Sequence, residues 1–583
     1  MQKTLLTYVK PHVQEDPLSM ILGIGYLGAM MERHKLPIAL HDERAGTDQE
    51  MKAAIDANDI IGFSALTPNI RRAIAWAKYA KEQGKTTIMG GPHASVDQGV
   101  FLDSGHFDYV LKGEAEHTLP ELVKAIEGKD DAKLQGIEGL ASMREGEMWV
   151  DNPAPPLIKK LDEIPMPARH LLPMESYFKN NPEHLVYIFT TRGCPFKCIF
   201  CQKELTGRGF RVRSTEAIVD ELEHIIKTYD PGVILFVDEI LTLRKKRIHE
   251  MCDEIIRRGL KFEWVANTRA DCVDYPLLKH MHRAGCRRIY YGWESGSQRM
   301  LDVLKKDLTP EVIVNAAKMT RRAGIWAKVY LIVGSPGETP EDIAETEKVL
   351  RLAGPDLIQI SVFNPLIGTE SWDNYQASID ISDLSENYVS SNRSGYKHEH
   401  FSQIELEELR KRMVRSYEQW YYSMPQRLRR VYERALYYME NPVHGRKRIG
   451  RALGLVPPPQ RHVVTNHPGA PRARRAAAPE RSSDPGRRSF RGALSAARSR
   501  RRSRSRADRR APRRSGRRSR PRLRGQVEPA RRPALPSRAP PRARSSTDPG
   551  ARVPRGQRGL RPDRRSRRDR RPCRSAPCPR RGS

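Results

Sequence analysis

The sequence lacks any long apolar run. No stretch approaches the roughly 18 residues that a membrane-spanning helix needs, and the N-terminus leads straight into a strand-like run, TLLTYV, rather than a signal peptide. We therefore expect a cytoplasmic protein with no membrane partner. Cysteine is also scarce, at 8 of 583 residues, and three of the six cysteines that precede residue 450 fall within eight positions. This spacing indicates a metal site in a reducing compartment rather than a disulfide framework.

The C-terminal stretch 451–583 lacks lysine entirely and contains one aromatic residue, Phe490. It holds 42 Arg, 7 acidic residues and 20 of the 43 Pro, which leaves residues 1–450 with 61 basic and 63 acidic side chains. The formal charge of +33 therefore belongs to this stretch and not to the rest of the chain. Because so few apolar residues cannot offset the entropy lost on ordering, we predict a disordered, Arg- and Pro-rich tail at 456–583.

The composition of this tail has two interpretations. Arg without Lys, among Pro, Ala, Gly and Ser, is what GC-rich codons encode in almost any frame, so the tail is interpreted as a frameshifted reading or an accidental extension. The alternative is a nucleic-acid-binding module with the Arg-rich tail as its electrostatic footprint. The composition favours the first interpretation, and we expect no specific nucleic-acid partner.

Residues 1–150 alternate short apolar runs with amphipathic helical patterns. Five β-α repeats whose strands are apolar almost throughout predict an α/β fold with a doubly wound, Rossmann-like parallel sheet. Sheets of this kind bind ligands at the carboxyl ends of their strands, so the loops there are the candidate binding elements. The predicted strands are 4–9, 38–41, 60–66, 86–89 and 109–111.

A Pro-rich segment at 151–183 is predicted to be a linker. The β-α rhythm then resumes over 184–390, where six units predict a partial (β/α)6 barrel with its chemistry at the C-terminal ends of the strands. A helical C-terminal segment is predicted at 391–455, with its aromatic residues packed in a core. The predicted barrel strands are 186–190, 233–237, 262–267, 288–292, 328–333 and 357–363, and the helix-ending glycines are Gly259, Gly285, Gly324 and Gly354.

The central motif follows the first predicted barrel strand. Cys194, Cys198 and Cys201 have the spacing CxxxCxxC on a loop, which lets three thiolates converge on one metal centre. Four sulfur ligands would close a zinc site or a cluster, whereas three leave one iron of a four-iron cluster open to a further ligand. The alternatives are a zinc knuckle without its fourth ligand, or cysteines grouped by chance.

These cysteines resemble the signature of the radical S-adenosylmethionine (SAM) superfamily, in which an aromatic residue precedes the last cysteine, as Phe200 does here. Segments 291–297, 334–339 and 364–369 resemble further motifs of that superfamily on successive strands. The resemblance implies a 4Fe-4S iron-sulfur cluster whose open iron binds SAM, and a 5′-deoxyadenosyl radical formed by reductive cleavage of SAM. The SAM-binding residues it implies are Phe200, Gly292, Glu294, Ser295 and Gly334.

The first domain resembles the cobalamin-binding domain of cobalamin-dependent radical SAM enzymes, because GFSALT, MGGPHAS and KGEAEHTLPEL end its strands. No DxHxxG sequence supplies an axial histidine, and segment 41–46 does not match that spacing. In this subfamily that implies a cobalt whose lower face has no histidine ligand. The cobalamin-binding residues implied are Ser64, Thr67, Gly90, Gly91, His93, Gly113 and Glu114.

The resemblance implies a methyltransferase that methylates an unactivated carbon of a small molecule, with phosphorus as the alternative acceptor, in antibiotic or other specialised-metabolite biosynthesis. Two SAM molecules would be consumed per turnover, and a flavodoxin- or ferredoxin-like protein would donate electrons. The alternative within this architecture is a non-methylating oxidase, cyclase or rearranging enzyme. A methylthiotransferase is disfavoured, because those enzymes carry three more cysteines in a different N-terminal domain.

Several further residues near strand ends are weaker candidates. Arg269 and Asp271 could orient a ligand or form a salt bridge within their loop, and Asp238 and Glu239 end the second barrel strand. Aromatic residues near these ends are expected mostly to fill the barrel interior. The remaining cysteines before residue 450 have no ligand spacing and are interpreted as small buried hydrophobes. They are Cys252, Cys272 and Cys286.

Overall fold

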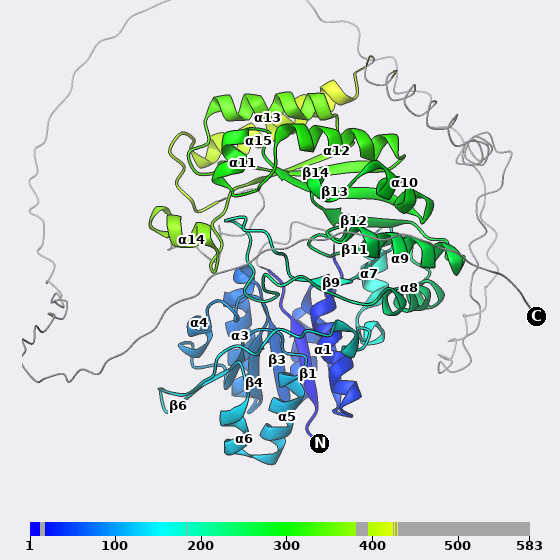
Figure 1. Ribbon diagram of the computed structural model, residues 1–583. Helices are drawn as coiled ribbons and strands as arrows, with labels where there is room; N and C mark the ends of the chain where they lie inside the picture. The colour runs from blue at the N-terminus through cyan, green and yellow to red at the C-terminus, as the bar shows by residue number, and fades with distance from the viewer. Residues whose placement is uncertain (12–17, 182, 380–393, 424, 426–427, 429–583) are drawn as a thin grey trace, which may run out of the picture. The chain divides into compact units, whose positions relative to one another are not determined.

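The computed structural model describes residues 1–11, 18–181, 183–379, 394–423, 425 and 428 (Figure 1). These residues belong to one compact unit, Met1–Thr465. The tail predicted at 456–583 and about half of the helical segment predicted at 391–455 lie outside the described residues. Within the described part of the chain, no helix has the length and apolar character needed to cross a membrane.

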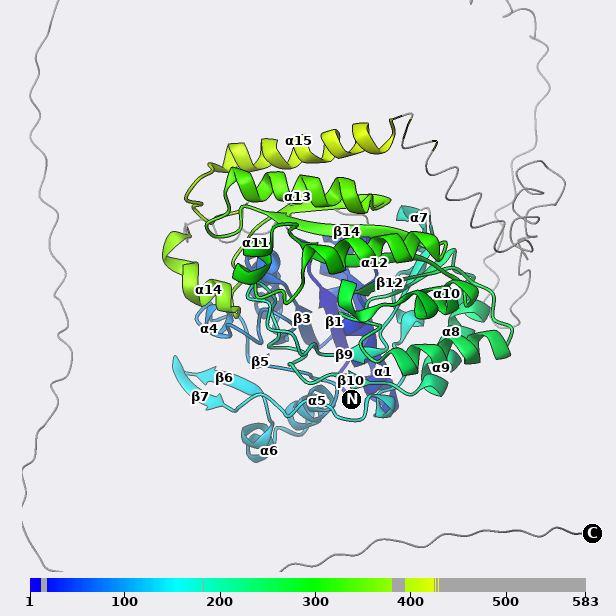
Figure 2. The same cartoon turned by 45° about the horizontal axis from the view of Figure 1, so that its top comes forward.

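The first domain is built on a seven-stranded sheet in the order β2-β1-β3-β4-β5-β6-β7. Its first five strands pair in parallel and coincide with the five apolar runs predicted from the sequence. An antiparallel hairpin, β6–β7, extends the sheet beyond β5 and was not predicted (Figure 2). The strands are β1 (Thr4–Tyr8), β2 (Ile38–Asp42), β3 (Ile60–Ser64), β4 (Thr86–Gly90), β5 (Tyr109–Leu111), β6 (Leu140–Arg144) and β7 (Glu147–Asp151).

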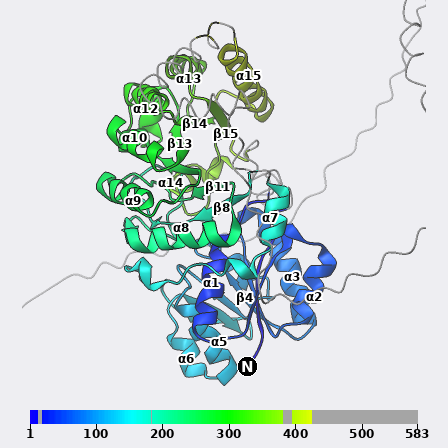
Figure 3. The same cartoon turned by 90° about the vertical axis from the view of Figure 1, so that its right-hand side faces the viewer.

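Helices cover both faces of this sheet, as a doubly wound fold requires (Figure 3). Consecutive strand residues such as Leu5 and Leu6 are both buried but belong to different apolar clusters on opposite faces. This two-sided burial explains why apolar residues occupy neighbouring positions in these strands instead of alternate ones only. One face carries α1 (Leu22–Arg33), α5 (Thr118–Gly128) and α6 (Asp131–Gly136), and the other carries α2 (Asp48–Asp56), α3 (Ile70–Glu82) and α4 (Gly99–Leu102).

Segment 151–183, predicted as a linker, is folded and packed. It contains η3 (Leu161–Glu163), η4 (Arg169–Leu171) and α7 (Met174–Asn180). Arg169 is 1% exposed and donates to Glu221 Oε1 at 2.6 Å and to the backbone carbonyl of Tyr187 at 2.7 Å. Tyr177 donates to Asp42 Oδ2 of the first domain at 2.8 Å. Segment 151–183 is therefore tied by buried polar contacts both to the sheet before it and to the barrel after it, and the domain boundaries themselves stay predictions.

The second half is a six-stranded parallel sheet in simple sequential order, β8-β11-β12-β13-β14-β15, as expected for a partial barrel. The four predicted helix-ending glycines all have positive φ, which confirms that prediction. The strands are β8 (Leu185–Ile188), β11 (Val233–Phe236), β12 (Trp264–Thr268), β13 (Cys286–Glu294), β14 (Trp326–Val333) and β15 (Leu357–Val362). The helices that follow them are α8 (Thr215–Tyr229), α9 (Lys245–Arg257), α10 (Tyr275–Arg283), α11 (Gln298–Val303), α12 (Pro310–Arg322), α13 (Pro340–Ala353) and α14 (Glu370–Tyr375).

Helix α15 (Gln403–Tyr421) packs along α13 at the end of the barrel (Figure 2). Its buried aromatic residues point inward: Tyr417 donates to the carbonyl of Pro355 at 2.5 Å, and Tyr421 donates to Asp356 Oδ1 at 2.8 Å. For these residues the prediction of a packing role holds, whereas the aromatic residues predicted to pack at 432–438 lie outside the described residues.

Candidate functional site

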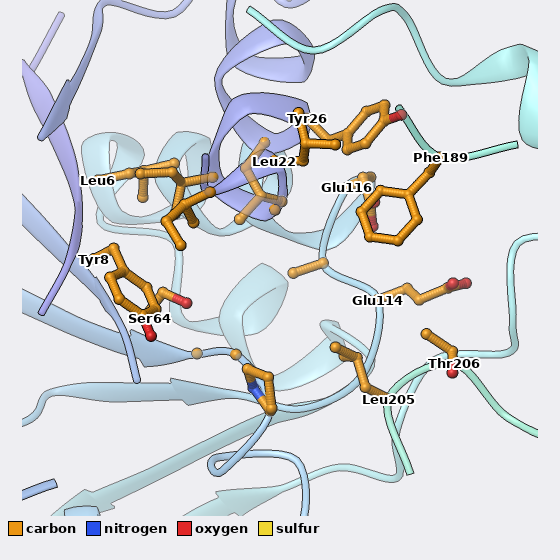
Figure 4. Close-up of a pocket in the computed structure, with 18 of the residues that line it drawn as sticks. Leu6, Tyr8, Leu22, Tyr26, Ser64, Glu114, Glu116, Phe189, Leu205 and Thr206 are labelled. Atoms are coloured by element: carbon orange, nitrogen blue, oxygen red, sulfur yellow. The ribbon is translucent and has the colours of Figure 1, made fainter. Parts of the chain in front are cut away.

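A cavity of about 480 Å³ lies where the carboxyl ends of β1, β3, β4 and β5 face the beginning of the barrel (Figure 4). Leu6, Tyr8 and Ser64 form part of one wall, and Phe189, Leu205 and Thr206 form part of the opposite wall. Most of the lining is apolar. A crevice at the carboxyl edge of a doubly wound sheet is where such folds bind their ligands.

Glycines bring the backbone close to this cavity. Gly91 has φ +92°, and a Cβ there would lie 2.7 Å from Ser64 Oγ. A Cβ at Gly62 would lie 2.5 Å from Leu6 Cδ2. Because neither position has room for a side chain, the wall stays thin and smooth, which suits a broad, flat and largely apolar ligand such as the face of a corrin ring.

The residues predicted to bind cobalamin divide into two groups. Thr67 and His93 do not line the cavity: His93 is 2% exposed, and its Nδ1 lies 3.1 Å from Thr67 Oγ1. Burial lowers the pKa of His93, and its ring packs edge-on against Phe101. The two side chains therefore shape the loop behind the wall, and their contact with cobalamin stays a prediction. The residues that do line the cavity are Ser64, Gly90, Gly91, Gly113 and Glu114.

The polar part of the cavity wall is an ion-pair network that connects the two halves of the site. Arg192 Nη1 donates to Glu114 Oε1 at 3.0 Å, and Arg192 Nη2 donates to Glu116 Oε1 at 2.5 Å. Arg211 adds a second bond to Glu114, at 2.7 Å. These cations, together with the backbone N–H of Ile158, hold the pKa of Glu114 below its ordinary value although burial opposes the shift. Neither Arg192 nor Arg211 could be predicted as a partner, because both lie far along the chain from the carboxylates.

The cysteine loop begins immediately after Arg192 of this ion-pair network. Arg192 belongs to the two-residue strand β9 (Thr191–Arg192), which pairs with β10 (Arg211–Val212). Gly193 follows with φ +84°, and a Cβ there would lie 2.2 Å from the carbonyl oxygen of Gly209. Only glycine fits at this turn, which starts the loop carrying Cys194, Cys198 and Cys201.

Asp238, at the end of β11, fixes the start of the cysteine loop. Its carboxylate is fully buried and accepts hydrogen bonds from the backbone N–H and the hydroxyl of both Thr190 and Thr191. Burial raises the pKa of Asp238, although Arg247 and these hydrogen bonds act in the opposite direction. The strand-end position was noted in the sequence, but this clamping role depends on contacts between neighbouring strands.

The surroundings of the three thiols suit an anionic sulfur-bound group. Burial raises the pKa of Cys194 and Cys198, while Lys203 lowers that of Cys194, and Lys306 and Arg269 lower that of Cys198. In the described residues, no three His, Cys, Asp or Glu side chains form a site for a single metal ion. In a four-iron cluster each thiolate binds a different iron, so its ligands stay farther apart than those of one ion. Three thiols on one loop, with cations around them, fit a cluster of this kind.

Three of the residues predicted to bind SAM meet beside this loop. Glu294 has φ +67° after a bulge in β13, and its Oε1 lies 2.8 Å from Lys306 Nζ. A Cβ at Gly292 would lie 2.5 Å from Glu294 Oε1, and Lys306 lies 5.9 Å from the ring centroid of Phe200. Gly292, Glu294 and Phe200 thus share one charged corner next to the cysteines, and Lys306 is a fourth member that sequence reasoning missed.

The other two predicted SAM residues make structural contacts. Ser295 Oγ lies 3.0 Å from Thr346 Oγ1 of α13. Gly334 has φ +75° and donates from its N–H to Glu338 Oε2 at 2.6 Å. Glu338 is 1% exposed, and burial raises its pKa to about 8. These contacts hold the loops after β13 and β14 in place.

The weaker candidate residues near the strand ends make defined contacts in the structure. Arg269 donates to Asp271 at 3.0 Å and lies 3.6 Å over the ring of Phe196 in the cysteine loop, so the salt bridge and a loop-positioning contact coexist. Among the aromatic residues of the barrel strands, Tyr291 lies on the helix-facing side of the sheet, with its hydroxyl 2.8 Å from Thr320 Oγ1 of α12. Its neighbour Tyr290 lies on the opposite side of the sheet, against Tyr330. Cys252, Cys272 and Cys286 are buried, as predicted.

The chain has a doubly wound domain followed by a partial barrel, and the cysteine loop follows the first barrel strand. Together these features define a class: a radical SAM enzyme with a preceding cobalamin-binding domain. Residues 188–350 match the radical SAM superfamily, and residues 20–123 match the B12 binding domain. An uncharacterized methyltransferase of Pyrococcus horikoshii, PH0819, is 33% identical over 359 residues, covering 60% of this chain and 77% of that protein. The chain therefore belongs to the cobalamin-dependent radical SAM family, and its cofactors are a 4Fe-4S cluster, SAM and cobalamin.

Further relatives differ in their reactions. An anaerobic magnesium-protoporphyrin IX monomethyl ester cyclase of Rubrivivax gelatinosus is 32% identical over 314 residues, covering 53% of this chain and 56% of that protein. A hopanoid C-3 methylase of Methylococcus capsulatus is 28% identical, covering 63% of this chain and 70% of that protein. The chain thus spans little more than half the length of that cyclase.

Solved structures share the fold. OxsB, a cobalamin-dependent SAM radical enzyme solved with aqua-cobalamin and SAM, aligns with a TM-score of 0.60 at 18% identity, over 72% of this chain and 66% of that one. TsrM of Kitasatospora setae, a radical SAM methyltransferase, aligns with a TM-score of 0.56 at 18% identity, over 65% of this chain and 76% of that one.

Proposed function

We propose that this chain is a cobalamin-dependent radical SAM methyltransferase that methylates a carbon atom of a small molecule. The observation that carries the proposal is the cavity itself. Its first wall comes from the cobalamin-binding domain and its second from the loop that carries the cluster cysteines and the strands beside it. A molecule in this cavity would be in reach of both halves of the site.

Each set of side chains has a part in the reaction. Cys194, Cys198 and Cys201 would bind the cluster, and Glu294 with Phe200 would border the SAM site. Once bound, SAM and the cluster supply a radical that removes a hydrogen atom, and cobalamin supplies a transferable methyl group. The apolar walls keep water away from the radical, and the ion pairs of Arg192 keep the two halves in register.

A second function has specific support. Magnesium-protoporphyrin cyclases of Rubrivivax gelatinosus and Cereibacter sphaeroides are 32% and 33% identical to this chain, as similar as the methyltransferase of Pyrococcus. An oxidation or ring closure without methyl transfer is therefore the competing proposal. A role in specialised metabolism and a flavodoxin- or ferredoxin-like electron donor complete the proposal and rest on the family resemblance.

One experiment separates the two functions. The reconstituted full chain is incubated without oxygen, with a low-potential reductant, SAM carrying a CD3 methyl group, and a fractionated small-molecule extract of the producing cells. Methyl transfer predicts a product that carries one CD3 group, as measured by mass spectrometry. An unlabelled product that has lost hydrogen atoms supports the cyclase-like function and contradicts methyl transfer. The control is Cys198→Ala, which should form neither product.

A further inference from the structure

Lys203 and Glu239 form an ion pair that lies between the cysteine loop and the cavity. Lys203 Nζ lies 2.9 Å from Glu239 Oε2, and Thr206 donates to Glu239 Oε1 at 3.1 Å. The lysine side chain is 7% exposed, whereas that of the glutamate is 34% exposed. A cation this deeply buried is expected to need a charged partner.

The two residues face different parts of the site. Lys203 follows Cys201 by two positions, and its carbonyl accepts from the N–H of Gly207 at 2.7 Å, which closes the end of the loop. Glu239 lines the cavity together with Thr206. The ion pair therefore connects the cavity wall, where Glu239 lies, with the end of the cysteine loop, where Lys203 lies.

The end of β11 holds both ends of the cysteine loop with consecutive carboxylates. Asp238 binds Thr190 and Thr191 before the cysteines, and Glu239 binds Lys203 and Thr206 after them. The first carboxylate is fully buried and has no access to the cavity, whereas the second forms part of its wall. Only Glu239 of these two can respond to what the cavity holds.

The backbone places the ion pair close to the cysteines. Lys203 is two positions from Cys201, and Gly207 donates to the carbonyl of Lys203 at 2.7 Å while it accepts from the N–H of Cys194 at 3.3 Å. The charges of Lys203 and Glu239 therefore act on any anionic group that the thiols bind, because a cation favours the more negative, reduced state and an anion disfavours it.

We propose that the Lys203–Glu239 ion pair sets the reduction potential of the iron-sulfur cluster and makes that potential depend on the occupancy of the cavity. Neither side chain is a catalytic residue, since both act through the charge they hold near the cysteines. A ligand that binds against Glu239 changes how completely the carboxylate neutralises Lys203. The proposal concerns the cluster alone and does not depend on methyl transfer.

Removing the positive charge and removing the negative charge should shift the reduction potential in opposite directions. The full chain is reconstituted with iron and sulfide, and the midpoint potential is measured by potentiometric titration followed by electron paramagnetic resonance. Lys203→Met should lower the potential, because Glu239 then faces the cluster without its partner. Glu239→Gln should raise it. We expect each change to be roughly tenfold in the equilibrium constant for reduction, which is about 59 mV for a one-electron couple.

Matched variants control for charge and folding. Lys227 and Glu223 form an exposed pair at 2.6 Å on α8, with the lysine side chain 72% exposed, so Lys227→Met and Glu223→Gln change net charge equally and should leave the potential unchanged. Lys203→Arg keeps the charge and should stay near the wild-type potential. Iron content per chain shows that each variant holds its cluster. If Lys203→Met fails to hold a cluster, Glu239→Gln alone still tests the sign.

The dependence on cavity occupancy is tested with aquocobalamin as the probe. Adding it should shift the potential of the wild type, and the shift should be smaller in Glu239→Gln. The proposal is overturned if the two substitutions shift the potential in the same direction, or if neither differs from the exposed-pair controls. An equal aquocobalamin shift in wild type and Glu239→Gln, or no shift in either, refutes the dependence on occupancy.

Discussion

Arg192 should contribute to stability far beyond an ordinary surface ion pair. Its side chain is 14% exposed, and those of its partners Glu116 and Glu114 are 8% and 3% exposed. Removing one member of a buried ion pair costs about 3–5 kcal/mol, because the remaining charge stays desolvated. Glu114 keeps its bonds to Arg211 and to the N–H of Ile158, so the unpaired charge after Arg192→Met is mainly that of Glu116. We therefore expect the free energy of unfolding to fall by about 3 kcal/mol, the lower end of that range.

A double-mutant cycle isolates the pair. Urea unfolding of wild type, Arg192→Met, Glu116→Gln and the double variant, followed by tryptophan fluorescence, should give a coupling energy of about 2 kcal/mol, within the usual range for residues in contact. The same cycle on the exposed pair Lys227–Glu223 should give about 0.3–0.5 kcal/mol. A coupling for Arg192 and Glu116 no larger than that of the exposed pair would refute the claim that this network joins the two halves.

Three further predictions test other parts of the site. Cys198→Ala should reduce the iron content of reconstituted protein from about four atoms per chain to near zero, whereas Cys252→Ala should leave it unchanged in the same iron assay. Gly91→Ala should weaken aquocobalamin binding by about tenfold in a spectroscopic titration, because a Cβ would overlap the hydroxyl beneath it, while Gly136→Ala, with open space around it, should not. Burial raises the folded-state pKa of Glu338 to about 8 from an ordinary 4.5, so the folded chain retains a proton that the unfolded chain releases, and stability should fall as pH rises through that window. The fall should reach at most about 1.4 kcal/mol per pH unit and should disappear in Glu338→Gln when urea unfolding is compared across the window.

The parallel strands of both sheets could be predicted because each contains a short apolar run and is followed by a polar or glycine-bearing loop. The β6–β7 hairpin escaped because its strand Glu147–Asp151 is short and mostly exposed, and its Glu145-Gly146 turn lacks the Asn-Gly or Asp-Gly pair that usually marks a hairpin. Segment 151–183 was predicted as a linker from its prolines, although apolar residues such as Ile158 and Leu161 are buried in it. Irregular spacing leaves no periodic signal for such residues.

The site shows a similar division. The cluster cysteines could be predicted from the sequence, and so could the glycines at positions that exclude a side chain. Each of these features depends on one short segment of the chain. The ion pairs could not be predicted, because Lys306 and Arg192 meet carboxylates that come from other loops or from the other domain. The cobalamin contact of His93 stays a prediction, because the fold places its Nδ1 3.1 Å from Thr67 Oγ1 in the loop behind the wall. Partner choice between distant charges is settled by tertiary structure.

The walls of the cavity come from both halves of the chain, and segment 151–183 fastens those halves together through Tyr177 and Arg169. A corrin held there would contact both halves at once, so its binding should stabilise the whole fold and not the first domain alone. The denaturant midpoints of the two halves should therefore rise together as aquocobalamin is added.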